Sequence, residues 1–182
     1  GLSIYDATKL SSENLNNIIK KAKKEYPLFT KKLEILQSKM PFQVLSRSSK
    51  DTFFDTFNEC GGIYRVKYFN HYFSKRLLTK LKDDKKFAQT IKLIVTNLKM
   101  TKAQISLLKL NPEGLDFKSV FHLAINAIRH KKEDLALVYL ENAFEKAYYR
   151  MQKDNIIFWQ YQLTKDIKYL NLLSTSWDVN IY

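Results

Sequence analysis

Two adjacent acidic pairs, Asp83-Asp84 and Glu133-Asp134, are the first candidates for acid–base chemistry in this sequence. Catalysis by paired carboxylates needs two acids at a fixed separation, one of them usually desolvated so that its pKa rises. Both pairs fall where helices are expected to begin, and acidic residues there complement the partial positive charge of the helix end. The pattern favours helix capping over catalysis, and we expect no catalytic residue in this chain.

The sequence contains few residues that could bind a metal or act as a thiol. His71, His122 and His130 form no His-x-x-x-His pair and no Cys/His set with zinc spacing, so we expect no metal site. His122 lies on an otherwise apolar helix, which favours a histidine at the helix flank over a general base. Cys60 is the single cysteine. A buried small apolar residue is the favoured interpretation, and an exposed thiol at a helix end is the alternative.

The glycine pair Gly61-Gly62 is the nearest approach to a phosphate-binding loop. It lacks the downstream Gly-Lys-Ser/Thr of a P-loop and the third glycine of a dinucleotide fingerprint. We therefore expect no nucleotide and no other cofactor.

Aromatic and basic residues alternate over 64–76, a pattern that could stack bases or sugars beneath a cationic rim. The aromatic residues also have helical spacing, which favours packing in the core. The set comprises Tyr64, Tyr68, Phe69, Tyr72 and Phe73, with Arg65, Lys67, Lys75 and Arg76 between them.

Two tryptophans need the same comparison, because this side chain can serve as a sugar platform or as a wedge between helices. Trp159, beside Phe158, is predicted to be in the core. Trp177 is expected in a connector over 174–180, where packing is favoured over ligand contact.

The composition predicts that helices position these residues. The chain has 182 residues, 45% of them hydrophobic, with only four glycines and three prolines, which is typical of an ordered helical protein. The periodicity predicts about nine helices stacked as hairpins. The first expected features are a hairpin over 13–40 interrupted at Pro27, a loop over 42–50, and helices over 51–59 and 63–82. A helix is expected to start at Asp84, and another at Thr101, with a capping box to Gln104. The remaining helices are expected over 117–130, over 132–151, from Asp154 or Asn155, and from 164–166 to Leu173.

Small residues mark the expected contact between the helices over 117–130 and 132–151, where Ala124 and Ala127 would face Ala136 and Ala143. This alternation of small and large residues is typical of tetratricopeptide-like hairpins, although no strict 34-residue period recurs elsewhere. The predicted fold is therefore all-α, with helical hairpins stacked into a curved superhelical, α-solenoid array. We expect a single domain over 1–182 with a sub-boundary near 60–62.

The formal net charge of +13 comes mostly from lysine, with 31 Lys and Arg against 18 Asp and Glu. Dispersed lysines on solvated helix faces explain this charge, and no nucleic acid partner is expected. A basic surface would still attract carboxylate-bearing polymers. No run of about eighteen apolar residues occurs, so no membrane span is expected.

Three stretches near the end of the chain carry a resemblance to a known family. They are Asn155–Leu163 (Asn-Ile-Ile-Phe-Trp-Gln-Tyr-Gln-Leu), 164–170 and 174–182. The chain resembles soluble lytic transglycosylases of the epsilonproteobacterial type, in their non-catalytic helical region. The resemblance covers the last third best, and before Ile63 only the helical-hairpin character agrees.

The resemblance implies a helical scaffold that positions glycan strands of peptidoglycan for a lysozyme-like catalytic domain. That domain uses one glutamate within a Glu-Ser signature, and no glutamate in this chain is followed by serine. The catalytic domain is therefore expected outside this chain, in a periplasmic parent enzyme whose signal peptide is absent here.

Two alternatives remain open. A helical-repeat adaptor without enzymatic activity would bind a protein partner in the groove between its hairpins, and such a protein would be cytoplasmic as readily as periplasmic. Nucleic-acid binding would require a clustered basic face. The sequence leaves the substrate-contacting residues unknown.

Overall fold

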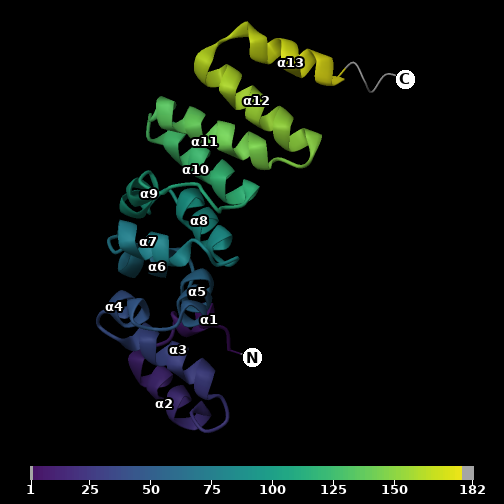
Figure 1. Ribbon diagram of the computed structural model, residues 1–182. Helices are drawn as coiled ribbons and strands as arrows, with labels where there is room; N and C mark the ends of the chain where they lie inside the picture. Colours follow the sequence, from purple (N-terminus) through teal and green to yellow (C-terminus); the bar gives the residue numbers. More distant parts are fainter. Residues whose placement is uncertain (1, 178–182) are drawn as a thin grey trace. The chain divides into compact units, whose positions relative to one another are not determined.

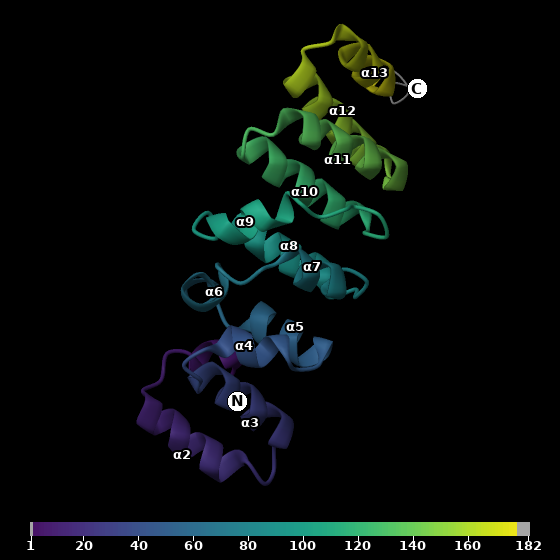
Figure 2. The same ribbon diagram turned by 60° about the vertical axis from the view of Figure 1, so that its left-hand side comes forward.

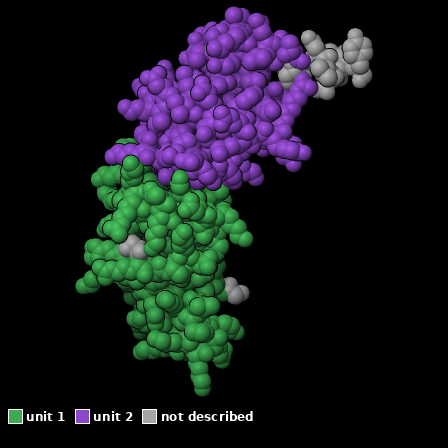
Figure 3. Space-filling view, in the orientation of Figure 1, with its two compact units in different colours: residues 1–106 green, residues 107–182 purple. Residues whose placement is uncertain are grey.

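The fold is all-α, as expected. The computed structural model describes residues 2–177, and every regular element in that range is a helix (Figure 1). The described range holds 13 helices, more than the nine predicted. The chain divides into two compact units, residues 1–106 and 107–182 (Figure 3). Residues 60–62, where the sequence suggested a sub-boundary, lie inside the first unit.

The first unit contains mostly short helices. They are α1 Ile4–Ala7, α2 Ser12–Ala22, α3 Pro27–Gln37, α4 Pro41–Ser46, α5 Lys50–Glu59, α6 Gly62–Phe69, α7 Lys75–Leu81, α8 Phe87–Thr96 and α9 Thr101–Leu107, whose last residue belongs to the second unit. The second unit contains longer helices, namely α10 Phe117–Arg129, α11 Glu133–Lys146, α12 Arg150–Thr164 and α13 Ile167–Trp177.

Serine side chains cap four of the short helices. The Oγ atoms of Ser3, Ser11, Ser49 and Ser74 each accept a hydrogen bond from a backbone N–H in the first turn of α1, α2, α5 and α7. A serine cap satisfies a donor that the helix itself leaves unpaired. The sequence predicts that α2 starts after Ser11 or Ser12, and the structure has Ser11 as its cap.

Two prolines correct the predicted boundaries. Pro27 and Pro41 are the first residues of α3 and α4, where the fixed φ of proline suits the helix and its missing N–H costs nothing. Helix α2 has already ended at Ala22, before Pro27. The loop predicted over 42–50 is therefore wrong, because α4 occupies most of it.

The long helix predicted over 63–82 is also wrong, because residues 70–74 separate α6 from α7. The Asn70 side chain donates to the backbone oxygen of Lys99 at 3.3 Å and accepts from the backbone N–H of Ala103 at 3.1 Å. Side chains such as Asn and Ser offer the backbone alternatives to helical hydrogen bonds. Asn70 and the Ser74 cap thus end one helix and start the next.

A cluster of phenylalanines forms the core of the first unit. The ring centroid of Phe57 lies 5.3 Å from that of Phe73, 5.4 Å from that of Phe69 and 5.8 Å from that of Phe53. All four side chains are buried. Aromatic pairs at these separations add about 0.5–1.5 kcal/mol each beyond the area that they bury.

Gln104, for which the sequence predicts a capping box with Thr101, bonds to the end of the preceding helix. Its buried amide donates to the backbone oxygens of Ile94 at 3.0 Å and Asn97 at 2.9 Å, where α8 ends. It therefore satisfies carbonyl groups that the end of α8 leaves free. The sequence places Leu98 on the buried face of the helix predicted from Asp84, and this is wrong, because Leu98 follows α8 and is 71% exposed.

In the second unit each helix packs against the next one along the chain, and α10 and α11 run side by side in both views (Figures 1 and 2). Ala124 and Ala127 on α10, and Ala136 and Ala143 on α11, are completely buried. The absence of large side chains at these positions lets the two backbones approach closely. The predicted packing of these two helices is confirmed, and the four alanines are buried in the second unit.

The connection between α11 and α12 corrects two predictions. Helix α11 ends at Lys146 and α12 begins at Arg150, so the helix predicted over 132–151 was too long and the start at Asp154 or Asn155 too late. The Oε1 atom of Gln152 accepts hydrogen bonds from the N–H groups of Tyr148 at 3.0 Å and Tyr149 at 3.1 Å. These bonds hold the turn and start the next helix.

A left-handed backbone conformation occurs in two turns of the second unit. Lys131 lies between α10 and α11 with a φ of 55°, and Lys165 lies between α12 and α13 with a φ of 56°. They are 34 residues apart, which is the period of tetratricopeptide hairpins. Both hairpins thus turn through a left-handed lysine.

Helix α13 extends further than predicted. It includes residues 174–177, which the sequence placed in a connector. The rest of that connector and the side chain of Trp177 lie outside the described residues.

Candidate functional site

The acidic pairs have the structural roles that their positions suggested. The Oδ1 atom of Asp84 accepts a hydrogen bond from the backbone N–H of Lys86 at 2.8 Å, just before α8. Glu133 and Asp134 lie in the first turn of α11. Neither arrangement holds two carboxylates around a common point.

Asp55 belongs to an ion-pair network between α3, α5 and the start of α8. Its two oxygens lie 3.1 Å from Lys32 Nζ and 2.9 Å from Lys86 Nζ, and Lys86 also lies 3.0 Å from Asp51. Burial alone would raise the pKa of Asp55, but the hydrogen bonds from Lys86 and Lys32 outweigh it and lower the pKa. A carboxylate held ionised in this way suits a structural ion pair rather than a proton donor.

Two of the histidines have contacts within their own units. His71 Nδ1 lies 3.1 Å from Lys102 Nζ, and His122 Nδ1 donates to the backbone oxygen of Lys118 at 2.7 Å. Among the residues that the structure describes, no group of three or more His, Cys, Asp or Glu side chains could hold a metal ion.

Cys60 is completely buried, as the favoured interpretation of the sequence had it. Its Sγ donates to the backbone oxygen of Phe57 at 3.4 Å. Burial raises the pKa of the Cys60 thiol to about 12, although the nearby charge of Arg65 acts in the opposite direction. Arg65 itself donates from Nη1 to the backbone oxygens of Phe57 and Asn58, both at 3.0 Å, and so closes the end of α5.

We expect Cys60 to resist alkylation by iodoacetamide at pH 8 in the folded protein. The thiolate is the nucleophile, and a pKa of about 12 in place of 9.0 lowers its fraction roughly a thousandfold. Mass spectrometry of the peptide that contains Cys60 measures the extent of alkylation. The urea-unfolded protein is the control, and it should react fully. Alkylation at equal rates in both states would contradict the buried placement.

A pocket of about 430 Å³ lies in the first unit, where α1 meets the turn between α5 and α6. Three tyrosines line it, namely Tyr5, Tyr64 and Tyr68. Two lysines lie against their rings, with Lys9 Nζ 3.8 Å from the centroid of Tyr5 and Lys67 Nζ 5.0 Å from that of Tyr68. The pocket therefore combines aromatic surface with positive charge.

The glycine pair shapes this pocket. Gly61 has a φ of +86°, and a Cβ atom there would lie 2.6 Å from Cδ2 of the Tyr5 ring. Only glycine allows both the left-handed backbone and the approach of the ring. Gly61 also provides no side-chain cap for α6, whose first turn lines the pocket.

A hydrogen bond to the backbone fixes the position of Tyr64 in the pocket wall. Its hydroxyl donates to the backbone oxygen of Leu36 at 2.7 Å, and its ring centroid lies 4.5 Å from that of Tyr68. Burial raises the pKa of Tyr64, so the hydroxyl remains a donor. The pocket wall is therefore fixed by packing and by a buried hydrogen bond.

The structure divides the alternating aromatic and basic set of the sequence. Core packing is confirmed for Phe69 and Phe73, which are buried, whereas Tyr72 is partly exposed and stacks on Phe42 at 4.8 Å. Tyr64 and Tyr68 line the pocket instead. Sequence reasoning missed Tyr5 and Lys9 as their partners.

The second unit has a more open groove of about 380 Å³ over α11, α12 and α13. Its lining includes Glu141, Glu145, Phe144, Ile157, Tyr169 and Leu172. Trp159 of α12, predicted to be in the core, is only half-buried.

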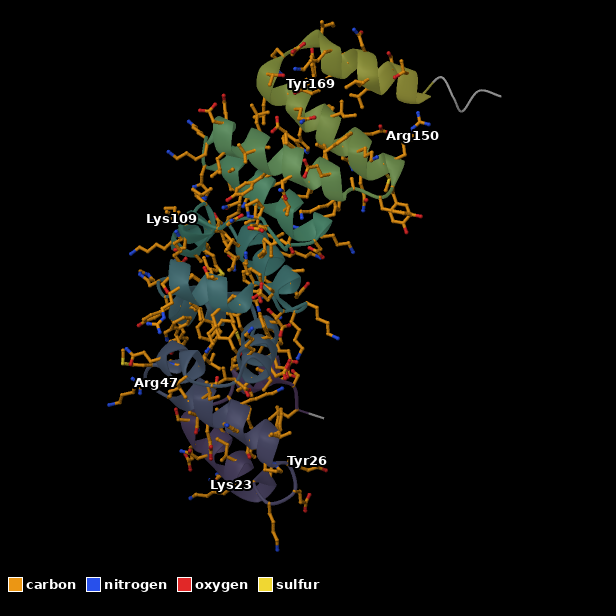
Figure 4. All side chains as sticks on the ribbon, viewed as in Figure 1. Lys23, Tyr26, Arg47, Lys109, Arg150 and Tyr169 are labelled. Carbon is orange, nitrogen blue, oxygen red and sulfur yellow. The ribbon has the colours of Figure 1, made fainter. Side chains whose placement is uncertain are left out.

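Basic side chains occur on both units, and the labelled Lys23, Arg47 and Lys109 in Figure 4 extend away from the ribbon. No helix within residues 2–177 is long and apolar enough to cross a membrane.

Comparison with known proteins gave no relative: no protein-family model matches the chain, and no curated protein matches it.

Proposed function

We propose that this chain is a non-catalytic helical scaffold segment of a periplasmic soluble lytic transglycosylase, which positions peptidoglycan strands for a lysozyme-like domain elsewhere in the protein. The recurrence of left-handed turns at Lys131 and Lys165 carries the proposal. This recurrence supports stacked hairpins in the last third of the chain, which is also where the resemblance to that family lies.

The charge of the chain supports contact with the glycan. Peptidoglycan carries carboxylates on its stem peptides, and a net charge of +13 attracts such a polymer over several ångströms. The role is positional, because holding a strand in one orientation relative to a catalytic group can contribute much of a rate enhancement.

We expect the purified chain to sediment with isolated sacculi at low ionic strength and to be released by salt, because exposed lysines are screened within a Debye length of about 8 Å at physiological salt. Sacculi stripped of stem peptides by an amidase serve as the matched control and should retain less protein. Failure to sediment with intact sacculi at low salt would count against direct contact with peptidoglycan.

A protein-binding adaptor remains the second candidate, supported by the groove over α11, α12 and α13 with its partly exposed Phe144 and Leu172. The coding sequence after Tyr182 discriminates the two functions. A lysozyme-like module with a Glu-Ser signature supports the transglycosylase, and further hairpins alone support the adaptor.

A further inference from the structure

We propose that the pocket between α1 and α6 binds a carboxylate-bearing amino sugar, with the sugar ring against its tyrosines and the carboxylate between Lys9 and Lys67. The inference rests on the proposed function for the choice of sugar, and on the residues of the first unit for the site itself. It assigns a contact set that the sequence left unknown.

The tyrosines supply the surface for the ring. Tyr5 is about half exposed, and Tyr68 is half-buried beside Tyr64. Lys9 lies over the ring of Tyr5 and Lys67 over that of Tyr68, so a sugar would lie against the ring edges and hydroxyl groups that these cations leave uncovered. The hydrogen bond of Tyr64 to Leu36 fixes the wall, so little order is lost when a ligand binds.

The charges of the pocket select an anion. Lys9 and Lys67 hold their ammonium groups against the tyrosine rings, and none of the described residues that line the pocket is acidic. Lys9 and Lys67 are both exposed, so a carboxylate on a sugar held there would meet the two cations in contact with water, where each ion pair contributes modestly. A neutral sugar of the same size would lack this contribution.

The size of the pocket suits a small saccharide. Its volume of about 430 Å³ lies in the range of 300–1,000 Å³ that is usual for small-molecule sites. The probe is therefore the disaccharide of N-acetylglucosamine and N-acetylmuramic acid, whose lactyl group carries the carboxylate. Diacetylchitobiose is the neutral analogue, and uridine monophosphate tests an aromatic anion of a different class.

Glycine amide resonances provide the readout in a ¹H–¹⁵N correlation spectrum. Gly61 and Gly62 line the pocket, whereas Gly114 belongs to the other unit and acts as the internal reference. The muramic disaccharide is expected to move the Gly61 and Gly62 signals and to leave Gly114 in place. Diacetylchitobiose should bind more weakly.

The double variant Lys9→Gln, Lys67→Gln tests the cations, with Lys20→Gln, Lys24→Gln as a control of equal charge on exposed positions of the same unit. The pocket variant should weaken binding of the disaccharide roughly tenfold, and the control by less than about twofold. Tyr68→Leu should weaken it roughly fivefold while Tyr68→Phe retains it. A circular dichroism melt shows whether each variant is folded.

Equal losses in both lysine variants, tighter binding of uridine monophosphate, or unmoved Gly61 and Gly62 signals would overturn the assignment. If the chain sediments with sacculi but the pocket variant sediments equally well, the scaffold proposal stands and the pocket is wrong. If the pocket binds the disaccharide while the coding sequence continues without a lysozyme-like module, the pocket stands and the proposed function is wrong.

Discussion

Replacing Phe57 with alanine is expected to lower the free energy of unfolding of the first unit by about 3–5 kcal/mol. The ring is completely buried and lies within 5.8 Å, centroid to centroid, of Phe53, Phe69 and Phe73. Removing it leaves a cavity among Phe53 of the same helix, Phe69 of α6 and Phe73 of the segment after α6, which cannot all move inward. Urea unfolding followed by far-ultraviolet circular dichroism measures the change.

Leu28→Ala is the control for this experiment, because Leu28 is 79% exposed on a helix of the same unit. Its expected effect is within about 0.5 kcal/mol. A loss below about 1 kcal/mol for Phe57→Ala would mean that the phenylalanine cluster does not determine the stability of the unit.

Replacing Ala127 with leucine is expected to destabilise the second unit by about 3 kcal/mol, at the upper end of the usual cost of overpacking. Ala127 is completely buried on α10, and the facing helix α11 presents Ala136 and Ala143, so three added carbons would force the two helices apart. Tryptophan fluorescence during urea unfolding measures the effect, because both tryptophans belong to this unit.

Ser174→Leu makes a similar change of size at an exposed position of α13 and should leave the fluorescence transition nearly unchanged. If both variants shift the transition equally, close approach of α10 and α11 is not the reason for the small residues.

The helical class could be predicted because periodicity and serine caps act over a few residues. The boundaries at Pro27, Pro41 and Asn70 could not. A proline can end one helix or begin the next, and the choice depends on how the chain packs. Asn70 ends α6 through bonds to Lys99 and Ala103, about thirty residues away, which no local pattern indicates.

The pocket was predictable only in part. Tyr64, Lys67 and Tyr68 belonged to the aromatic and basic set that the sequence singled out, but Tyr5 and Lys9 lie far from them along the chain. The one local hint was the glycine pair Gly61-Gly62, which lies between the helices predicted over 51–59 and 63–82. The positive φ of Gly61 and its closeness to the Tyr5 ring show that the absence of a side chain at Gly61 also lets α1 form part of the pocket wall.

The left-handed turns at Lys131 and Lys165 have a consequence for how such hairpins are found. Lysine tolerates this torsion at a cost of roughly 1–2 kcal/mol, whereas glycine would adopt it freely. The geometry of a helical hairpin can therefore recur along a chain without the glycine that usually permits its turn. A search for repeated backbone torsions would find such a hairpin where a search for repeated residues would miss it.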